Sequence, residues 1–125
     1  SFTLAGTEQD LNLVVNGWSG DAIQTALFGL VAPSGFAVRS YGLDALVGTS
    51  LLVQNKLSEK YTASNDGSGA LQGTVTLVVT SPPQPPQGAT EWTDKAMHGT
   101  LDATLPLDPN SPGQPGSKVT AHFAF

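Results

Sequence analysis

The sequence predicts an all-β fold, a run of antiparallel hairpins that forms a β-sandwich or a partly closed barrel. Three observations lead to this prediction. Several stretches alternate apolar and polar residues with the period of two that a half-buried strand requires. The 14 glycines and 9 prolines among the 125 residues supply many turns. Charged residues amount to only 12%, about half the ~25% of ordinary soluble domains. Uncharged polar residues must therefore cover the surface, and such a surface is more typical of sheets than of helices.

The clearest strand lies in residues 69–80. One parity is apolar and the other is polar over most of this stretch, which indicates one face in the core and one in water. We therefore expect Val75 and Leu77 to be buried and Thr74 and Thr76 to be exposed. The apolar set is Leu71, Val75, Leu77 and Val79, and the polar set is Gln72, Thr74, Thr76 and Thr80.

Four earlier stretches have strand character. Residues 1–6 are apolar enough for a short edge strand or a tether, and residues 11–18 alternate clearly. Residues 23–31 are apolar on both parities, which predicts a strand covered on both faces. Residues 36–41 alternate again, with Phe36 and Val38 on one side and Arg39 and Tyr41 on the other.

The stretch from Leu43 to Leu57 allows two interpretations. Leu43, Leu46, Val47 and Leu51 fit helical spacing. The glycine at position 48 costs a helix about 1 kcal/mol relative to alanine, and β-branched residues favour a strand. We predict a strand here. The alternative is an α+β fold with a helix near 43–57.

The rest of the chain completes one predicted domain, residues 1–125. Residues 64–69 form a hairpin loop. Residues 81–88 form a Pro-rich loop, because proline has no backbone donor for a sheet ladder. Residues 95–105 and 118–125 alternate as strands, with a second Pro/Gly loop between them.

Charge and composition exclude several kinds of partner. The net charge of −5, with only 5 Lys and Arg, argues against nucleic acid. The sequence contains no apolar run near the ~20 residues that span a bilayer. The absence of cysteine excludes disulfides, thiolate catalysis and Cys-ligated zinc. We expect a monomer without a metal or a cofactor.

The two histidines and one aspartate are the residues that best suit acid–base chemistry. Parity places His98, Asp102 and His122 on the outer face of the last two strands. Residues four apart on a strand are about 13 Å apart, so His98 and Asp102 cannot share a metal. Asp102 and His122 can form a cross-strand pair, which we interpret as an exposed polar pair. A hydrolase that uses these three residues is the more distant alternative, and we expect no catalytic residue.

Aromatic residues give the better functional hypothesis. Trp18 ends a strand, Trp92 follows the Pro-rich loop, and large rings at loop ends form platforms on which sugars stack. We expect Trp18, Trp92 and Tyr41 to contact a ligand, with Asn16 supplying hydrogen bonds. The alternative interpretation is that each tryptophan caps one end of the core.

The layout resembles the small β-domains of exported bacterial lipoproteins. The resemblance implies a β-fold and an extracytoplasmic location (secreted, periplasmic or at the cell surface), and it transfers no functional residue. The segments that carry it are Val15-Asn16-Gly17-Trp18, Lys60-Tyr61-Thr62, His98-Gly99-Thr100-Leu101 and Val119-Thr120-Ala121-His122-Phe123.

The sequence therefore predicts an exported or cell-surface β-domain that acts as a non-catalytic binding module for carbohydrate or another small ligand. The alternative is a protein-interaction or inhibitor domain that works through residues 81–88. A polyproline segment is ordered before it binds and loses little entropy in the aromatic groove of a partner.

Overall fold

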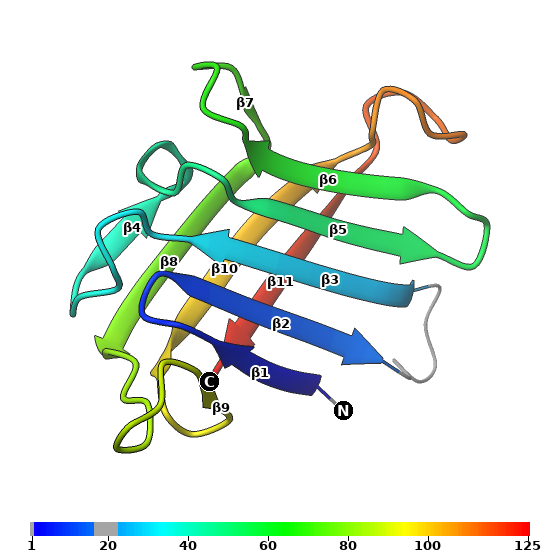
Figure 1. Cartoon of the computed structure of the whole chain (residues 1–125). Coiled ribbons are helices and arrows are strands. Elements are labelled where there is room, and N and C mark those ends of the chain that lie inside the picture. Colours follow the sequence, from blue (N-terminus) through cyan, green and yellow to red (C-terminus); the bar gives the residue numbers. More distant parts are fainter. Residues whose placement is uncertain (1, 17–22) are drawn as a thin grey trace.

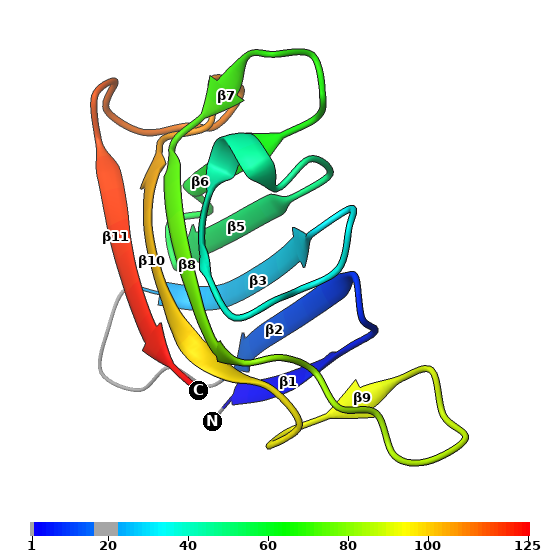
Figure 2. The same cartoon turned by 90° about the vertical axis from the view of Figure 1, so that its left-hand side faces the viewer.

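The structure, a computed structural model, describes residues 2–16 and 23–125 and confirms the all-β prediction. Two antiparallel sheets face each other and do not close into a barrel, as in a β-sandwich (Figure 1). The larger sheet has seven strands in the order β7-β6-β5-β3-β2-β1-β9, and the smaller has four in the order β11-β10-β8-β4. Figure 2 shows the two layers side on, with the short strand β9 beyond their lower edge.

The strands of the larger sheet are β1 (Phe2–Gly6), β2 (Asp10–Asn16), β3 (Ile23–Val31), β5 (Ser50–Asn55), β6 (Lys60–Asn65), β7 (Leu71–Gln72) and β9 (Trp92–Thr93). Those of the smaller sheet are β4 (Ser40–Gly42), β8 (Thr74–Ser81), β10 (His98–Pro106) and β11 (Lys118–Ala124). The described part of the chain has one helical element, the 3-10 turn η1 (Leu43–Ala45), and so no helix that could cross a membrane.

The core fills the space between the sheets, and strand parity decides which side chains enter it. In β8, Val75, Leu77 and Val79 are buried while Thr74 and Thr76 are exposed, as predicted. Leu101, Ala103 and Leu105 of β10 pack from the same sheet, and Leu11, Leu13, Phe28 and Leu51 pack from the other.

The stretch 69–80 is not one continuous strand, because the chain changes sheets at Gly73. Leu71 and Gln72 pair with β6 in the larger sheet, whereas β8 pairs with β10 in the smaller one. Gly73 has φ 75°, a backbone conformation that glycine adopts without steric cost. A Cβ there would lie 2.5 Å from the carbonyl oxygen of Thr104. Leu71 therefore lies at an exposed corner and not in the core.

Two further expectations need correction. Strand β3 is covered on one face only: Ala26, Phe28 and Leu30 are buried, but Leu27 is 44% exposed. The reason is that β3 belongs to an antiparallel sheet in a two-layer fold, where the outer face is left to solvent.

Residues 36–41 do not form the predicted alternating strand. Only residues 40–42 pair, with β8, and Tyr41 lies opposite Leu77. This pairing turns Tyr41 into the core, while Val38 remains exposed in the preceding loop. From Leu43 onward the α-helical alternative is wrong. The 3-10 turn η1 is followed by β5, so the strand prediction is confirmed from Ser50 to Asn55.

The Pro-rich segment is a loop, as predicted, and it leads to β9. The Gln84 N–H donates to the carbonyl oxygen of Ala96 at 3.0 Å. This hydrogen bond holds the first half of the loop against the segment that precedes β10. Strand β9 then pairs with β1 at Ala5 and Gly6. Strand β1 consequently has neighbours on both sides and is not the edge of its sheet.

Candidate functional site

The four residues predicted to contact a ligand do not form one cluster in the described part of the structure. Trp18 and the side chain of Asn16 lie outside the described residues. Tyr41 is 5% exposed. Its hydroxyl donates to the Gly35 carbonyl oxygen at 3.2 Å and accepts from the Ala37 N–H at 2.8 Å. Through these two hydrogen bonds, Tyr41 stabilises the loop before β4.

Trp92 is buried in a junction between the Pro-rich loop and the first hairpin. Its ring is 1% exposed, and its indole N–H donates to the Thr7 carbonyl oxygen at 2.6 Å. Asp94, two residues later, accepts a hydrogen bond from the Leu4 N–H at 2.6 Å. These two contacts attach the segment around β9 to β1. Trp92 therefore has a clear structural role, and it also lines a pocket.

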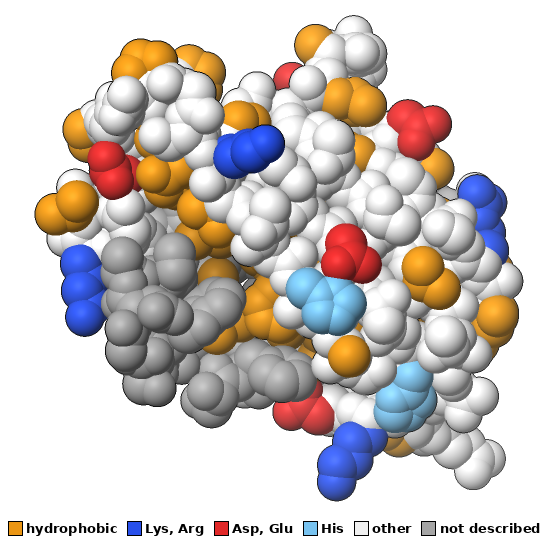
Figure 3. Space-filling view, turned by 180° about the vertical axis from the view of Figure 1, so that it is seen from behind, with side chains coloured by type: hydrophobic (Ala, Val, Ile, Leu, Met, Phe, Trp, Pro, Cys, Tyr) orange, Lys and Arg blue, Asp and Glu red, His pale blue; other side chains and the backbone are white. Residues whose placement is uncertain are grey.

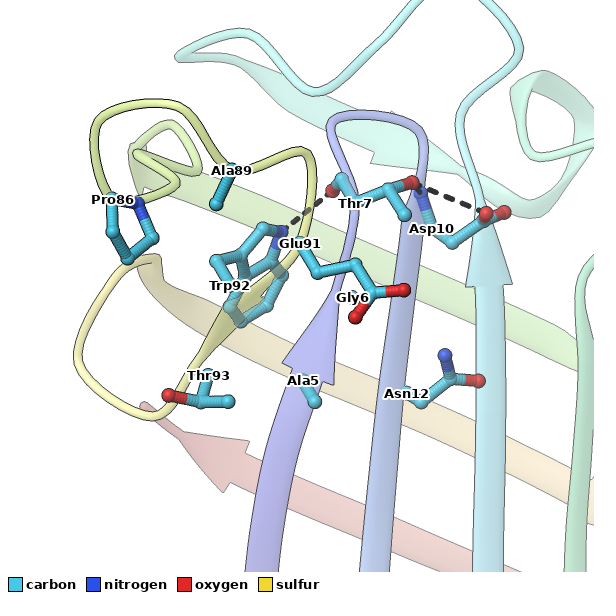
Figure 4. Close-up of a pocket in the computed structure, with 10 residues that line it drawn as sticks. All are labelled: Ala5, Gly6, Thr7, Asp10, Asn12, Pro86, Ala89, Glu91, Trp92 and Thr93. Atoms are coloured by element: carbon cyan, nitrogen blue, oxygen red, sulfur yellow. Dashed lines mark hydrogen bonds between the residues drawn. The ribbon is translucent and has the colours of Figure 1, made fainter.

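This pocket, which we term the β1–β9 pocket, has a volume of about 510 Å³. Strand β1, the start of β2 and the segment 86–93 line this open pocket, and Trp92 lies between the loop and the hairpin (Figure 4). The apolar lining consists of Ala5, Gly6, Pro86, Ala89 and Trp92. The polar lining consists of Thr7, Asp10, Asn12, Glu91 and Thr93.

The polar groups of the β1–β9 pocket are two carboxylates, one amide and two hydroxyls. The Asp10 carboxylate accepts a hydrogen bond from the Thr7 hydroxyl at 3.2 Å, while Glu91 is exposed. Among the residues that the structure describes, no lysine or arginine lines the pocket. Such a lining offers many hydrogen-bond acceptors to hydroxyl or amine groups and repels anions. Of the four residues expected from the sequence, Trp92 lines this pocket.

Asp102 and His122 form the cross-strand pair that their parity allows. They lie directly opposite each other on β10 and β11, with His122 Nδ1 2.5 Å from Asp102 Oδ1. Both side chains are more than half exposed on the outer face of the smaller sheet. Figure 3 shows the molecule from behind, with a histidine in pale blue beside an acidic side chain in red near the centre of the view.

The register around this pair does not match that of an acyl-transfer triad. Thr76 lies opposite Asp102 on the other side, so the cross-strand order is Thr76, Asp102, His122. A triad places the imidazole between the carboxylate and the hydroxyl, whereas here the carboxylate is in the middle. His98 lies at the far end of β10, opposite Ser81. Among the described residues, no three metal-binding side chains gather at one point.

The polar loop after β6 uses its oxygens within its own turns. Asn65 is buried, and its Oδ1 accepts from the Gly67 N–H at 2.9 Å. Asp66 Oδ1 accepts from the Ser68 N–H at 2.9 Å. Hydrogen bonds from the Ser68 side chain and backbone lower the pKa of the Asp66 carboxyl. This geometry agrees with the interpretation of the loop as a turn.

Fold and site together define a two-sheet antiparallel β-protein with a polar, acidic pocket beside its first hairpin. Comparisons of the chain with models of known protein families, with curated proteins and with solved structures found no match. The functional conclusion therefore rests on the pocket itself.

Proposed function

We propose that this chain is an exported or cell-surface β-domain that binds a small hydroxyl-rich ligand, such as a carbohydrate, without transforming it. The β1–β9 pocket is the binding site. The observation that supports this proposal is the convergence of Asp10, Asn12 and Glu91 on one hollow of about 510 Å³, a size within the ~300–1,000 Å³ of ordinary ligand sites.

The lining favours a neutral or amine-bearing sugar over an acidic one. Carboxylates and amides are good partners for sugar hydroxyls because each accepts or donates hydrogen bonds in a fixed direction. An anionic sugar would meet Asp10 and Glu91 without a lining cation. Trp92 offers little ring face for stacking, since it is almost fully buried. Its part is to hold the loop that carries Glu91 against the hairpin.

The proposal is tested by titrating the protein with a panel of neutral, amino and uronic acid oligosaccharides, followed by NMR shifts and calorimetry. We expect binding of neutral or amino sugars, with shifts centred on Asn12 and Thr93. Glu91→Gln and Asn12→Ala should each weaken binding by about tenfold, the value of one hydrogen bond to a charged or amide group.

The matched control is Glu8→Gln. Glu8 is an exposed carboxylate in the same β1–β2 turn, and it does not line the β1–β9 pocket. This variant should bind as the wild type does. Preference for uronic acids, or equal losses from Glu8→Gln and Glu91→Gln, would contradict the proposal.

Protein recognition through the Pro-rich loop is the second candidate, because residues 86–90 are exposed and project past the edge of the sheets (Figure 2). The hydrogen bond from Gln84 to Ala96 restrains the other half of the loop. The groove of a partner would have to enclose that restrained half as well. Pro85 does not line the β1–β9 pocket. Replacing Pro85 by alanine should therefore weaken binding to such a partner and leave sugar binding intact.

A further inference from the structure

A second open pocket lies at the end of the molecule opposite β9 and is lined by the loop that joins β10 to β11. This loop, residues 107–117, and strand β9 are at opposite ends of the molecule in Figures 1 and 2. The pocket has a volume of about 450 Å³, within the ~300–1,000 Å³ of ordinary ligand sites. It shares no lining residue with the β1–β9 pocket. We term it the β10–β11 pocket.

The loop that lines this pocket is held in place by strand β6 of the larger sheet. The Asp108 N–H donates to the Lys60 carbonyl oxygen at 2.8 Å, and the Lys60 N–H donates to the Ser111 hydroxyl at 2.7 Å. Leu107 forms an isolated bridge with Tyr61. Because three residues of the loop are fixed to one strand, the pocket is formed before a ligand arrives, and little conformational entropy is lost on binding.

Among the described residues that line the pocket, Asp108 supplies the one carboxylate, and this group is already used within the loop. Its Oδ1 accepts from the Asn110 N–H at 2.8 Å and its Oδ2 accepts from the Thr62 hydroxyl at 3.3 Å. The Ser111 hydroxyl accepts from a backbone N–H of β6 and donates to the Pro112 carbonyl oxygen at 3.0 Å. Both side chains therefore stabilise the loop itself.

The polar groups that remain available in the pocket can all donate hydrogen bonds. The hydroxyls of Thr74, Thr104 and Ser117 have no protein partner within the described part of the chain. The ammonium group of Lys118 likewise forms no ion pair with a described residue. Thr74 lies opposite Thr104, and Lys118 lies opposite Pro106, two residues further along β10. Opposed Cβ atoms are about 4.5–5.5 Å apart and diagonal ones about 7–8 Å, so these donors can reach a single anionic group.

Apolar side chains form the other walls of the β10–β11 pocket. Three prolines line it together with Leu107, and a proline offers apolar ring surface without a backbone donor. Apolar walls with a few convergent polar groups are typical of a site for a small molecule. The prolines are Pro106, Pro109 and Pro115.

We propose that the β10–β11 pocket binds a small anion with an apolar body. The anionic group, a carboxylate or a phosphate, contacts Lys118 and Thr104, and the apolar body packs against the prolines. This site is separate from the β1–β9 pocket, whose carboxylates Asp10 and Glu91 repel anions. The two ends of the molecule thus differ in the ligand charge that they accept, and this inference does not rest on the proposed sugar.

NMR titration with benzoate, phenyl phosphate, inorganic phosphate and the uncharged benzamide tests the proposal. Benzoate and phenyl phosphate should shift the backbone signals of Thr104, Ser117 and Lys118, with dissociation in the millimolar range or tighter, as expected for ligands of about ten non-hydrogen atoms. Benzamide should bind at least about tenfold more weakly than benzoate, because it lacks the charge that attracts Lys118. Inorganic phosphate should bind more weakly than phenyl phosphate, because it leaves the apolar walls uncovered. The tighter of the two aromatic anions identifies the anionic group.

Two pairs of variants locate the binding site. Lys118→Gln should weaken binding of both aromatic anions by about tenfold or more, the value of a hydrogen bond to a charged group. Its control is Lys56→Gln, which changes the net charge equally at an exposed position outside the lining. Thr104→Val should weaken binding by about threefold. Its control is Thr120→Val, directly opposite on β11 and outside the lining. Both controls should bind as the wild type does.

The absence of a saturable shift at this loop would overturn the proposal. Equal binding of benzoate and benzamide would do so as well, as would equal losses from Lys118→Gln and Lys56→Gln. Equal binding of inorganic and phenyl phosphate would show that the prolines contribute nothing, which contradicts the apolar body. All of these measurements are made without a sugar, so their failure and the failure of the proposed function are distinguishable.

Discussion

Three buried polar residues, Thr49, Asn55 and Asn65, hold the turns of this protein together. The Asn55 side-chain oxygen accepts from the backbone N–H groups of Leu57 and Glu59, at 2.9 and 3.0 Å. The Thr49 hydroxyl accepts from the Val31 N–H at 2.9 Å. Each side chain thereby supplies a partner to backbone groups that a tight turn removes from water.

Asn65 provides the sharpest test at this scale. Its amide donates to the carbonyl oxygens of Leu43 and Asp44, at 2.9 and 3.3 Å, and its own oxygen accepts from Gly67. Asn65→Ala should lower the free energy of unfolding by about 2–4 kcal/mol, because buried backbone groups lose their partners. Asp66→Ala, at an exposed neighbour, should cost well under about 1 kcal/mol. Urea denaturation measures both. Equal losses would mean that the Asn65 bonds contribute little.

Single residues also show how far the site could be predicted. The sequence indicates Trp92 as a residue of interest, because large aromatics at loop ends are uncommon enough to notice. It does not indicate Asp10, Asn12 or Glu91, which come together only because β9 pairs with β1 across a long stretch of sequence. A contact between distant segments leaves no local pattern to detect. The burial of Trp92 agrees with the alternative interpretation, in which it caps one end of the core, and the sequence alone did not decide between the two interpretations.

Strands with a regular alternation were predictable, and irregular connections were not. β8, β10 and β11 follow their parity because one face of each meets the core. β3 misled the prediction because its exposed side carries the apolar Leu27. The strand predicted over residues 36–41 was also wrong. Pairing with β8, and not local alternation, turns the side chain of Tyr41 into the core. The only sequence signal for the change of sheet between β7 and β8 is the glycine at position 73. Many ordinary turns contain a glycine, so this signal does not predict a change of sheet.

Strand β8 gives the test at the scale of an element. Leu77→Ala should lower the free energy of unfolding by about 2–5 kcal/mol, because a cavity adds to the lost transfer energy. Thr76→Ala, exposed on the other face, should cost less than about 1 kcal/mol through lost cross-strand contact. Thermal and urea denaturation of both variants supply the comparison. If Thr76→Ala were the more damaging, the buried face of β8 would be wrongly assigned, and with it the outward position of Asp102 and His122.

Over the whole molecule, both sheets share one core and contact each other at several points. Phe28 of β3 meets Phe123 of β11 edge to face, with ring centroids 5.6 Å apart. On another side, Tyr61 of β6 forms an isolated bridge with Leu107, just after β10. Neither sheet has a second apolar layer of its own, so each depends on the other to cover its inner face.

This shared core predicts a single cooperative unfolding transition. Leu13→Ala removes a core side chain from the larger sheet and Leu101→Ala removes one from the smaller. Each should lower the free energy of unfolding by about 2–5 kcal/mol, a large part of the 5–15 kcal/mol typical of such a domain. Far-ultraviolet circular dichroism reports both sheets, whereas tryptophan fluorescence reports in part the environment of Trp92 beside β1. In both variants the two signals should shift together and keep one midpoint. Separate midpoints, with fluorescence unaffected by Leu101→Ala, would show that the sheets unfold independently.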